Sequence, residues 1–170
     1  MVLVLRRAAI FVALVLAFAL LAAVASHAAT RDREVVAFAG FAPGTIVVKT
    51  GERILYYVLD AQRALRFPVG VGRSGKTWTG TARVEGKFVR PAWQAPPELG
   101  GGPVIPGGAI NNPMGEAALT LRGGEYAIHG TNRPASIGHF VSYGCIRMYN
   151  RDIVELFRLV AVGTPVIVER

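Results

Sequence analysis

The 170-residue sequence contains a single cysteine, Cys145. Without a second thiol the chain cannot form an intramolecular disulfide. A structural cysteine in an oxidising compartment is usually paired, so a single one there is buried and inert, paired with another chain, or reactive. The residues before it, Ser142, Tyr143 and Gly144, are not those of an apolar strand interior. This context favours a reactive thiol over a buried small hydrophobe.

Other missing features restrict the class of protein. The sequence has no internal repeats, no heptad pattern and no acidic or Ser/Thr-rich tail, which predicts one domain around a single core. Acidic residues are few, with 11 Asp and Glu against 19 Lys and Arg, a formal net charge of +8. The basic residues are scattered singly, which argues against nucleic acid as a partner. Anionic lipid headgroups, carboxylate-bearing cell-wall polymers and plain surface solubility remain as reasons for this charge.

The N-terminus has the pattern of an export signal. Arg6 and Arg7 precede an uninterrupted apolar run over residues 8–25, and small residues follow, with A-x-A-like sites ending at Ala25 and Ala28. The run is also close to the length of an uncleaved membrane anchor. Both alternatives place the rest of the chain in the periplasm or cell envelope, because the two arginines stay inside. The segments that we predict are a signal peptide or anchor, a linker and a folded domain, over residues 1–28, 29–43 and 44–170.

The rest of the sequence predicts a mainly β fold. Apolar residues at positions i, i+3, i+4 and i+7 indicate a helix over Arg151–Val160, with Asn150 as its cap. The other elements are short, rich in β-branched residues and separated by Gly/Pro turns, which is typical of a β-sandwich or a partly closed barrel. The strands that we expect are Thr45–Lys49, Arg53–Leu59, Leu65–Val71, Thr79–Phe88, Ala117–Leu121, Glu125–His129 and Pro165–Glu169.

Residues 91–113 interrupt this pattern with six prolines and two glycine runs. No regular element is expected there. A loop of this length in a compact domain is either a lid or binding loop, or a floppy surface insertion.

A histidine is placed to act with the cysteine. His129 is expected at the end of a strand, sixteen positions before Cys145. A catalytic thiol must be available as thiolate, and a nearby imidazole is the usual group that takes its proton, so the pair indicates nucleophilic catalysis. Together with His139 the two could instead bind zinc, but the sequence has no close-spaced ligand pair such as C-x-x-C. We therefore expect neither a metal nor a cofactor.

Several motifs resemble the catalytic domain of L,D-transpeptidases over residues 44–169. They are His129-Gly130-Thr131, Ile137-Gly138 and Ser142-Tyr143-Gly144-Cys145-Ile146-Arg147-Met148, followed by Asn150 and Asp152, with Asn112-Pro113-Met114-Gly115 and Val162-Gly163-Thr164-Pro165-Val166 on either side. The resemblance implies the barrel or sandwich of that family, with one late helix and no cofactor.

The resemblance also implies acyl transfer on peptidoglycan stem peptides. Cys145 attacks the carbonyl between the L-centre of diaminopimelate and the terminal D-alanine of a tetrapeptide stem, which forms a thioester and releases D-alanine. An amine of a second stem, a lipoprotein or a D-amino acid then resolves the thioester. Water as the acceptor makes the protein an L,D-carboxypeptidase or a cross-link hydrolase instead. A non-catalytic cell-wall-binding module, in which Cys145 only packs, is the third alternative.

The resemblance assigns roles to the residues of this constellation. His129 transfers the thiol proton to the leaving amine, which needs an imidazole titrating near neutrality. Its other ring nitrogen is expected to bond the backbone carbonyl of Ser142, and the Gly144 and Cys145 amides are the expected oxyanion donors. Gly130 and Thr131 shape the loop beside the histidine.

Substrate contacts are assigned less uniquely. Arg147 lies two residues beyond the nucleophile, where its planar fork either holds a substrate carboxylate or forms a salt bridge with Asp152. Tyr143 stands where many family members carry histidine, so the contribution of that histidine must be replaced or absent, and we count Tyr143 among the substrate-binding candidates. Trp78 and Trp93 either stack on glycan sugars or pack in the fold.

Overall fold

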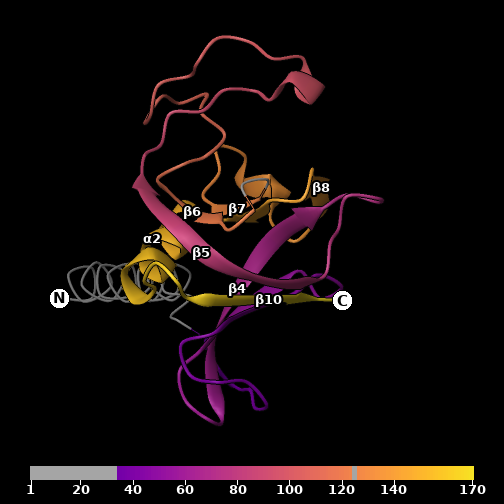
Figure 1. Cartoon of the computed structure of the whole chain (residues 1–170), viewed down its shortest axis with the longest axis vertical. Coiled ribbons are helices and arrows are strands. Elements are labelled where there is room, and N and C mark those ends of the chain that lie inside the picture. Colours follow the sequence, from indigo (N-terminus) through magenta and orange to yellow (C-terminus); the bar gives the residue numbers. More distant parts are fainter. Residues whose placement is uncertain (1–33, 124–125) are drawn as a thin grey trace, which may run out of the picture. The chain divides into compact units, whose positions relative to one another are not determined.

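The computed structural model describes residues 34–123 and 126–170 (Figure 1). The chain divides into two compact units, Met1–Glu34 and Val35–Arg170. The predicted signal peptide or anchor lies outside the described residues. No helix within the described ranges is long and apolar enough to cross a membrane.

The described part of the second unit is built mainly from β-strands (Figure 1). The strands are β1 Glu34–Ala37, β2 Ile46–Lys49, β3 Ile54–Val58, β4 Arg63–Gly72, β5 Gly80–Val89, β6 Ala117–Leu121, β7 Ala127–His129, β8 Phe140–Ser142, β9 Ile146–Met148 and β10 Pro165–Glu169. The helices are α2 Asn150–Leu159 and two single 3₁₀ turns, Pro97–Leu99 and Pro134–Ser136.

Pairing between the strands closes a barrel. The order β4-β3-β2-β10-β5-β6-β7-β9 forms a path, and β9 pairs back onto β4 through Val69 with Met148 and Gly70 with Arg147. Strands β1 and β8 pair with β4 outside this ring. The prediction of a mainly β fold is confirmed, and the architecture formed is the barrel, with its ring complete. Closure leaves no open sheet edge within the ring.

The core lies inside the ring and beneath the helix. Alternate strand residues such as Leu55 and Leu119 are fully buried in it, and Ile153 and Leu156 of α2 join the same cluster. Full burial of such a side chain stabilises the fold by roughly 1.5–3 kcal/mol. The helix packs on β6 and β7 (Figure 1). It thereby fixes the strand that ends at His129.

Two expectations about element boundaries differ from the structure. The range 29–43 was predicted to be a linker, yet it contains β1, and Phe38 stacks on Tyr56 with 4.2 Å between ring centroids. The apolar residues of this range cover a second small core, which explains the order. The cap position of α2 is held by Tyr149, without a side-chain capping bond, and Asn150 is the first residue of the helix rather than its cap. Its amide is bonded to neighbouring loops instead.

The proline-rich segment is an ordered excursion above one end of the barrel (Figure 1). Trp93 and Ile105 exchange both backbone hydrogen bonds, at 3.0 and 2.7 Å. Asn112 is 2% exposed, and its Nδ2 donates to the carbonyls of Pro91 at 2.9 Å and Pro106 at 3.0 Å. The loop is therefore closed by its own hydrogen bonds, which favours a lid or binding loop over a floppy insertion.

Candidate active site

Strands β7 and β9 bring the predicted nucleophile and base to one surface. They are parallel neighbours in which Ile128 pairs with Ile146 and His129 with Arg147. Side chains alternate across a strand. The two isoleucines enter the core, so His129 and Arg147 point to the opposite side. Cys145 directly precedes Ile146, so the same alternation would carry its side chain to that side as well.

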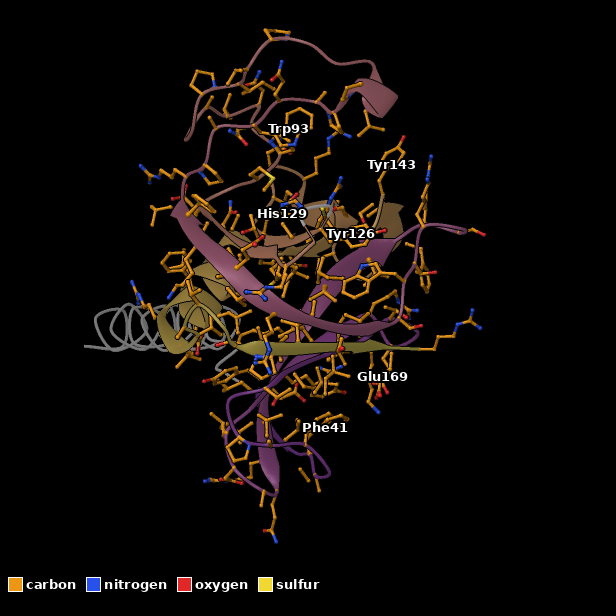
Figure 2. The ribbon with its side chains drawn as sticks, viewed as in Figure 1. Phe41, Trp93, Tyr126, His129, Tyr143 and Glu169 are labelled. Atoms are coloured by element: carbon orange, nitrogen blue, oxygen red, sulfur yellow. The ribbon has the colours of Figure 1, made fainter. Side chains whose placement is uncertain are left out.

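The electrostatics agree with this placement. Burial is the main cause of the lowered pKa of His129, and the positive charge of Arg147 adds to it; the same charge opposes the burial that raises the pKa of Cys145. The guanidinium therefore lies near both groups. Figure 2 shows His129 on the side of the barrel that faces the loop bearing Trp93. The backbone carbonyl of Pro113, at the end of that loop, acts on the imidazole as well.

The histidine is buried and held in one tautomer. Its side chain is 4% exposed, and Nδ1 lies 2.6 Å from the carbonyl oxygen of Gly130. A carbonyl only accepts hydrogen bonds, so Nδ1 donates and the lone pair of the neutral ring is on Nε2. Burial lowers the pKa of His129 to about 4. The partner is therefore Gly130 and not Ser142, and the imidazole does not titrate near neutrality as the sequence-based mechanism expected.

The thiol of Cys145 is partly buried. Burial raises its pKa, and this outweighs the backbone amide of Ala127 and the charge of Arg147, which both lower it. With the pKa of the imidazole lowered and that of the thiol raised, the dyad at neutral pH is a thiol beside a neutral imidazole.

Ser142 organises the turn that presents the thiol. It is 1% exposed, its Oγ donates to the Cys145 carbonyl at 2.6 Å, and it accepts the Gly144 N–H at 3.1 Å. A hydroxyl engaged on both sides is a structural group. The Gly144 amide, predicted to be an oxyanion donor, already has an acceptor in this arrangement.

Two aromatic residues that the sequence did not single out as partners hold the same turn. Gly144 has φ 128°, and a Cβ there would collide with the ring of Tyr126. Tyr126 stacks on Trp78 with centroids 5.1 Å apart, and Trp78 Nε1 donates to the Gly144 carbonyl at 3.0 Å. Trp78 therefore positions the nucleophile turn. No sequence spacing points to it, because 66 positions separate the two hydrogen-bonded residues.

Asn150 fixes the loop after the histidine. Its Oδ1 accepts the N–H groups of Thr131 at 3.0 Å and Glu116 at 3.2 Å, and its Nδ2 donates to the Thr131 carbonyl at 3.1 Å. A Cβ on Gly130 would collide with the same Oδ1. The predicted contribution of Gly130 and Thr131 to the loop beside His129 thus has a physical basis, and Asn150 acts through them.

Arg147 has an unsatisfied donor. Its Nε is buried without a hydrogen-bond partner among the described residues. Burial lowers the pKa of Arg147, and the nearby positive charge of Arg133 lowers it further. Asp152 forms its salt bridge with Arg151 at 3.2 Å. The alternative in which Asp152 pairs with Arg147 is therefore wrong. Two guanidinium groups without a carboxylate partner in the described ranges suit an anionic ligand.

Tyr143 stands at the outer edge of the turn and is 46% exposed. The guanidinium carbon of Arg73 lies 4.1 Å from the centroid of its ring. The backbone N–H of Arg73 donates to the Ser142 carbonyl at 2.9 Å. Tyr143 is thus paired with a cation.

The other histidine of the described residues, His139, is separate from the pair formed by His129 and Cys145. His139 is exposed, and its Nδ1 donates to the Ile137 carbonyl at 3.0 Å. Within residues 34–123 and 126–170, no group of three or more His, Cys, Asp or Glu side chains is arranged to hold a metal ion.

A cavity of about 820 Å³ adjoins the histidine loop. Its lining includes Thr131, Tyr149 and, from the proline-rich loop, Ile110. Its size is sufficient for a ligand of several hundred daltons.

Comparisons with known proteins agree with the motif. The family model described as the L,D-transpeptidase catalytic domain matches residues 43–168. The probable L,D-transpeptidase YbiS of Escherichia coli K12 is 40% identical over 135 residues, which cover 71% of this chain and 43% of that protein. The putative L,D-transpeptidase YkuD of Bacillus subtilis 168 is 52% identical over 65 residues, covering 38% of this chain and 37% of that protein. The chain spans less than half the length of these curated relatives.

Solved structures share the fold. L,D-transpeptidase 3 from Mycobacterium tuberculosis superposes with a TM-score of 0.61 at 17% identity, covering 74% of this chain and 60% of that one. The catalytic domain of the Enterococcus faecium L,D-transpeptidase gives 0.57 at 22% identity, covering 73% and 95%. The match of the family model over most of the chain, on the barrel and motif described above, shows that this chain belongs to the L,D-transpeptidase catalytic domain family.

Proposed function

We propose that the protein is an L,D-transpeptidase that acts on peptidoglycan tetrapeptide stems through a thioester on Cys145. The observation that supports this proposal is the pairing of His129 with Arg147, two residues after Cys145, where the buried Nε of Arg147 has no partner among the described residues. Acyl transfer from a peptide carboxyl end requires a nucleophile, a proton acceptor and an anion-binding group, and the charge of Arg147 acts on both the thiol and the imidazole.

The first half-reaction starts from the neutral dyad. As Cys145 Sγ attacks the scissile carbonyl, Nε2 of His129 takes the thiol proton. Because the lowered pKa of the imidazole disfavours a stored imidazolium, proton transfer accompanies formation of the C–S bond. The imidazolium then gives the proton to the leaving amine as the C–N bond breaks, which releases D-alanine and leaves the thioester.

Positioning groups complete the first step. The backbone N–H of Cys145 is the donor that we assign to the tetrahedral oxyanion, while Ser142 Oγ keeps Gly144 in the turn. The guanidinium of Arg147, which lies beside the histidine that protonates the leaving group, binds the D-alanine carboxylate. A carboxylate there would satisfy the buried Nε.

The second half-reaction transfers the acyl group to an amine, with His129 again acting as the base. The amine belongs to a second stem, a lipoprotein or a free D-amino acid. We place this chemistry in the periplasm or cell envelope, with residues 1–28 as signal peptide or membrane anchor and 44–170 as the catalytic domain. The excess of basic residues favours association with the anionic cell wall.

Product analysis tests the proposal. The purified protein is incubated with tetrapeptide stems and the products are weighed by mass spectrometry. Cross-linked dimer with released D-alanine is expected. Tripeptide monomer alone would identify an L,D-carboxypeptidase, and the absence of D-alanine release would contradict catalysis altogether. Cys145→Ser serves as the matched inactive control.

A further inference from the structure

Arg73 and Tyr143 form a fixed cation beside the nucleophile turn. The Arg73 backbone donates to the carbonyl of Ser142 at 2.9 Å, and its guanidinium carbon lies 4.1 Å from the centroid of the next ring along the turn. Both ends of the residue are therefore tied to the segment that carries Cys145. No described carboxylate forms a salt bridge with Arg73, so its charge is uncompensated.

Stacking leaves the guanidinium able to bind an anion. The guanidinium carbon lies over the ring, whereas a carboxylate binds at the N–H groups along the edge of the guanidinium. An exposed cation–π contact contributes only weakly to stability, but it restricts where the long side chain lies. Tyr143 thus holds the guanidinium of Arg73 in one orientation beside the nucleophile turn.

The arrangement around Cys145 separates two sides of a bound donor. His129 and Arg147 face each other across β7 and β9. Because His129 protonates the leaving amine, the leaving D-alanine lies on their side. Tyr143 precedes the nucleophile, and Arg73 follows the end of β4 next to Ser142. The acyl part of the donor therefore extends toward Tyr143 and Arg73.

The acyl residue of the proposed donor carries a suitable group. Diaminopimelate has two carboxyl groups, and only that of its L-centre is consumed in the scissile amide. We propose that Arg73, held in place by Tyr143, binds the second carboxylate and makes the site selective for donors whose acyl residue is a free acid. This inference rests on the proposed function.

The two cations then act at different stages. Arg147 loses its ligand when D-alanine departs, whereas the acyl residue stays on Cys145. Arg73 therefore holds the thioester through the second half-reaction as well. In this way Tyr143 and Arg73 together supply a substrate contact at the position of Tyr143, where the family resemblance leads us to expect histidine.

Two donor stems test the inference, identical except that the second carboxylate of the acyl residue is a carboxamide in one of them. The kcat/KM for D-alanine release is measured for each. We expect the unmodified protein to prefer the acid by roughly fivefold, the scale of an exposed ion pair. In Arg73→Gln the ratio is expected to fall to about one, in Tyr143→Leu it falls part of the way, and Arg73→Lys retains a part of it.

Arg53 provides a matched control, because its guanidinium also contacts an aromatic ring. Arg53 stacks on Phe140 at 5.1 Å, at the end of β8 away from the nucleophile turn, so Arg53→Gln should keep the wild-type ratio. Arg73 is exposed, so its variants should fold, and thermal unfolding of each variant is measured as the check. Equal rates on both donors in the unmodified protein, or an unchanged preference in Arg73→Gln, would overturn the inference while D-alanine release still supports the proposed function. Release from neither donor would overturn both.

Discussion

The indole N–H of Trp78 donates a 3.0 Å hydrogen bond to the carbonyl of Gly144, directly before the nucleophile. The same indole stacks on Tyr126, whose ring leaves no room for a Cβ at Gly144. The turn that aims the thiol is thus held from the barrel wall by a residue that precedes β5.

Replacing this indole separates its hydrogen bond from its packing. Trp78→Phe keeps an aromatic ring but removes the donor, and the loss of one partly buried hydrogen bond should lower the free energy of unfolding by about 1 kcal/mol. We expect kcat for D-alanine release to fall several-fold with KM little changed, because the turn no longer holds the thiol of Cys145 in the position for attack. Trp93→Phe, on the proline-rich loop, is the control for a generic Trp change. Equal kcat in the Trp78 variant and the wild type would show that the bond does not position the turn.

The burial of His129 predicts a dependence of stability on pH. The folded protein binds the imidazole proton with a pKa of about 4, while an unfolded histidine has a pKa of about 6.5. Between these values the unfolded chain binds more protons, so stability is full above pH 6.5 and is lost as the pH falls toward 4. The loss should reach on the order of 3 kcal/mol and then level off.

Denaturant unfolding at a series of pH values measures this loss. The difference between wild type and His129→Gln isolates the imidazole from the other titrating groups. A difference that does not vary between pH 4 and 6.5 would mean that the histidine is accessible to protons in the folded state.

The reactivity of Cys145 should follow its raised pKa. Alkylation by iodoacetamide requires the thiolate, so its rate is expected to be low at neutral pH and to rise into the alkaline range. Removing a positive charge that lowers the thiol pKa moves this rise further up, so Arg147→Gln should react more slowly at each pH. Arg133→Gln is the control, because the charge of Arg133 acts on Arg147 and is not among the causes that shift the pKa of Cys145. A rate plateau below pH 7 would indicate a preformed thiolate–imidazolium pair and contradict the neutral dyad.

Asn150 offers a test of indirect positioning. In Asn150→Ala the N–H groups of Thr131 and Glu116 lose their acceptor, which should lower stability by about 1–3 kcal/mol and kcat by more than KM changes. Asn150→Asp restores the acceptor and adds a negative charge, so it should recover part of the stability and raise the pKa of His129. The pH dependence of D-alanine release reports that change. If Asn150→Asp leaves the profile unmoved, Asn150 does not act on the histidine loop.

Local patterns in the sequence were sufficient for the helix and for seven of the ten described strands, because alternation and the 3.6-residue period are visible in consecutive residues. The short strands β1, β8 and β9 were not expected. The closure of the barrel could not be predicted from local patterns, because the pairing of Gly70 with Arg147 depends on tertiary packing. The motif located Cys145, His129 and Arg147. The partner of the imidazole, the low pKa that burial causes, and the support from Trp78 and Asn150 arise from contacts between distant segments, which no spacing reveals.

The most direct test of the account is the mass of the intact protein after brief exposure to a tetrapeptide stem. We expect an acyl adduct on the peptide containing Cys145, formed with stoichiometric release of D-alanine and strongly slowed in His129→Ala. Two results would contradict a thioester on Cys145 formed with the help of His129. One is release of D-alanine by the Cys145→Ser protein without an adduct, and the other is an adduct that forms equally fast in the protein without His129.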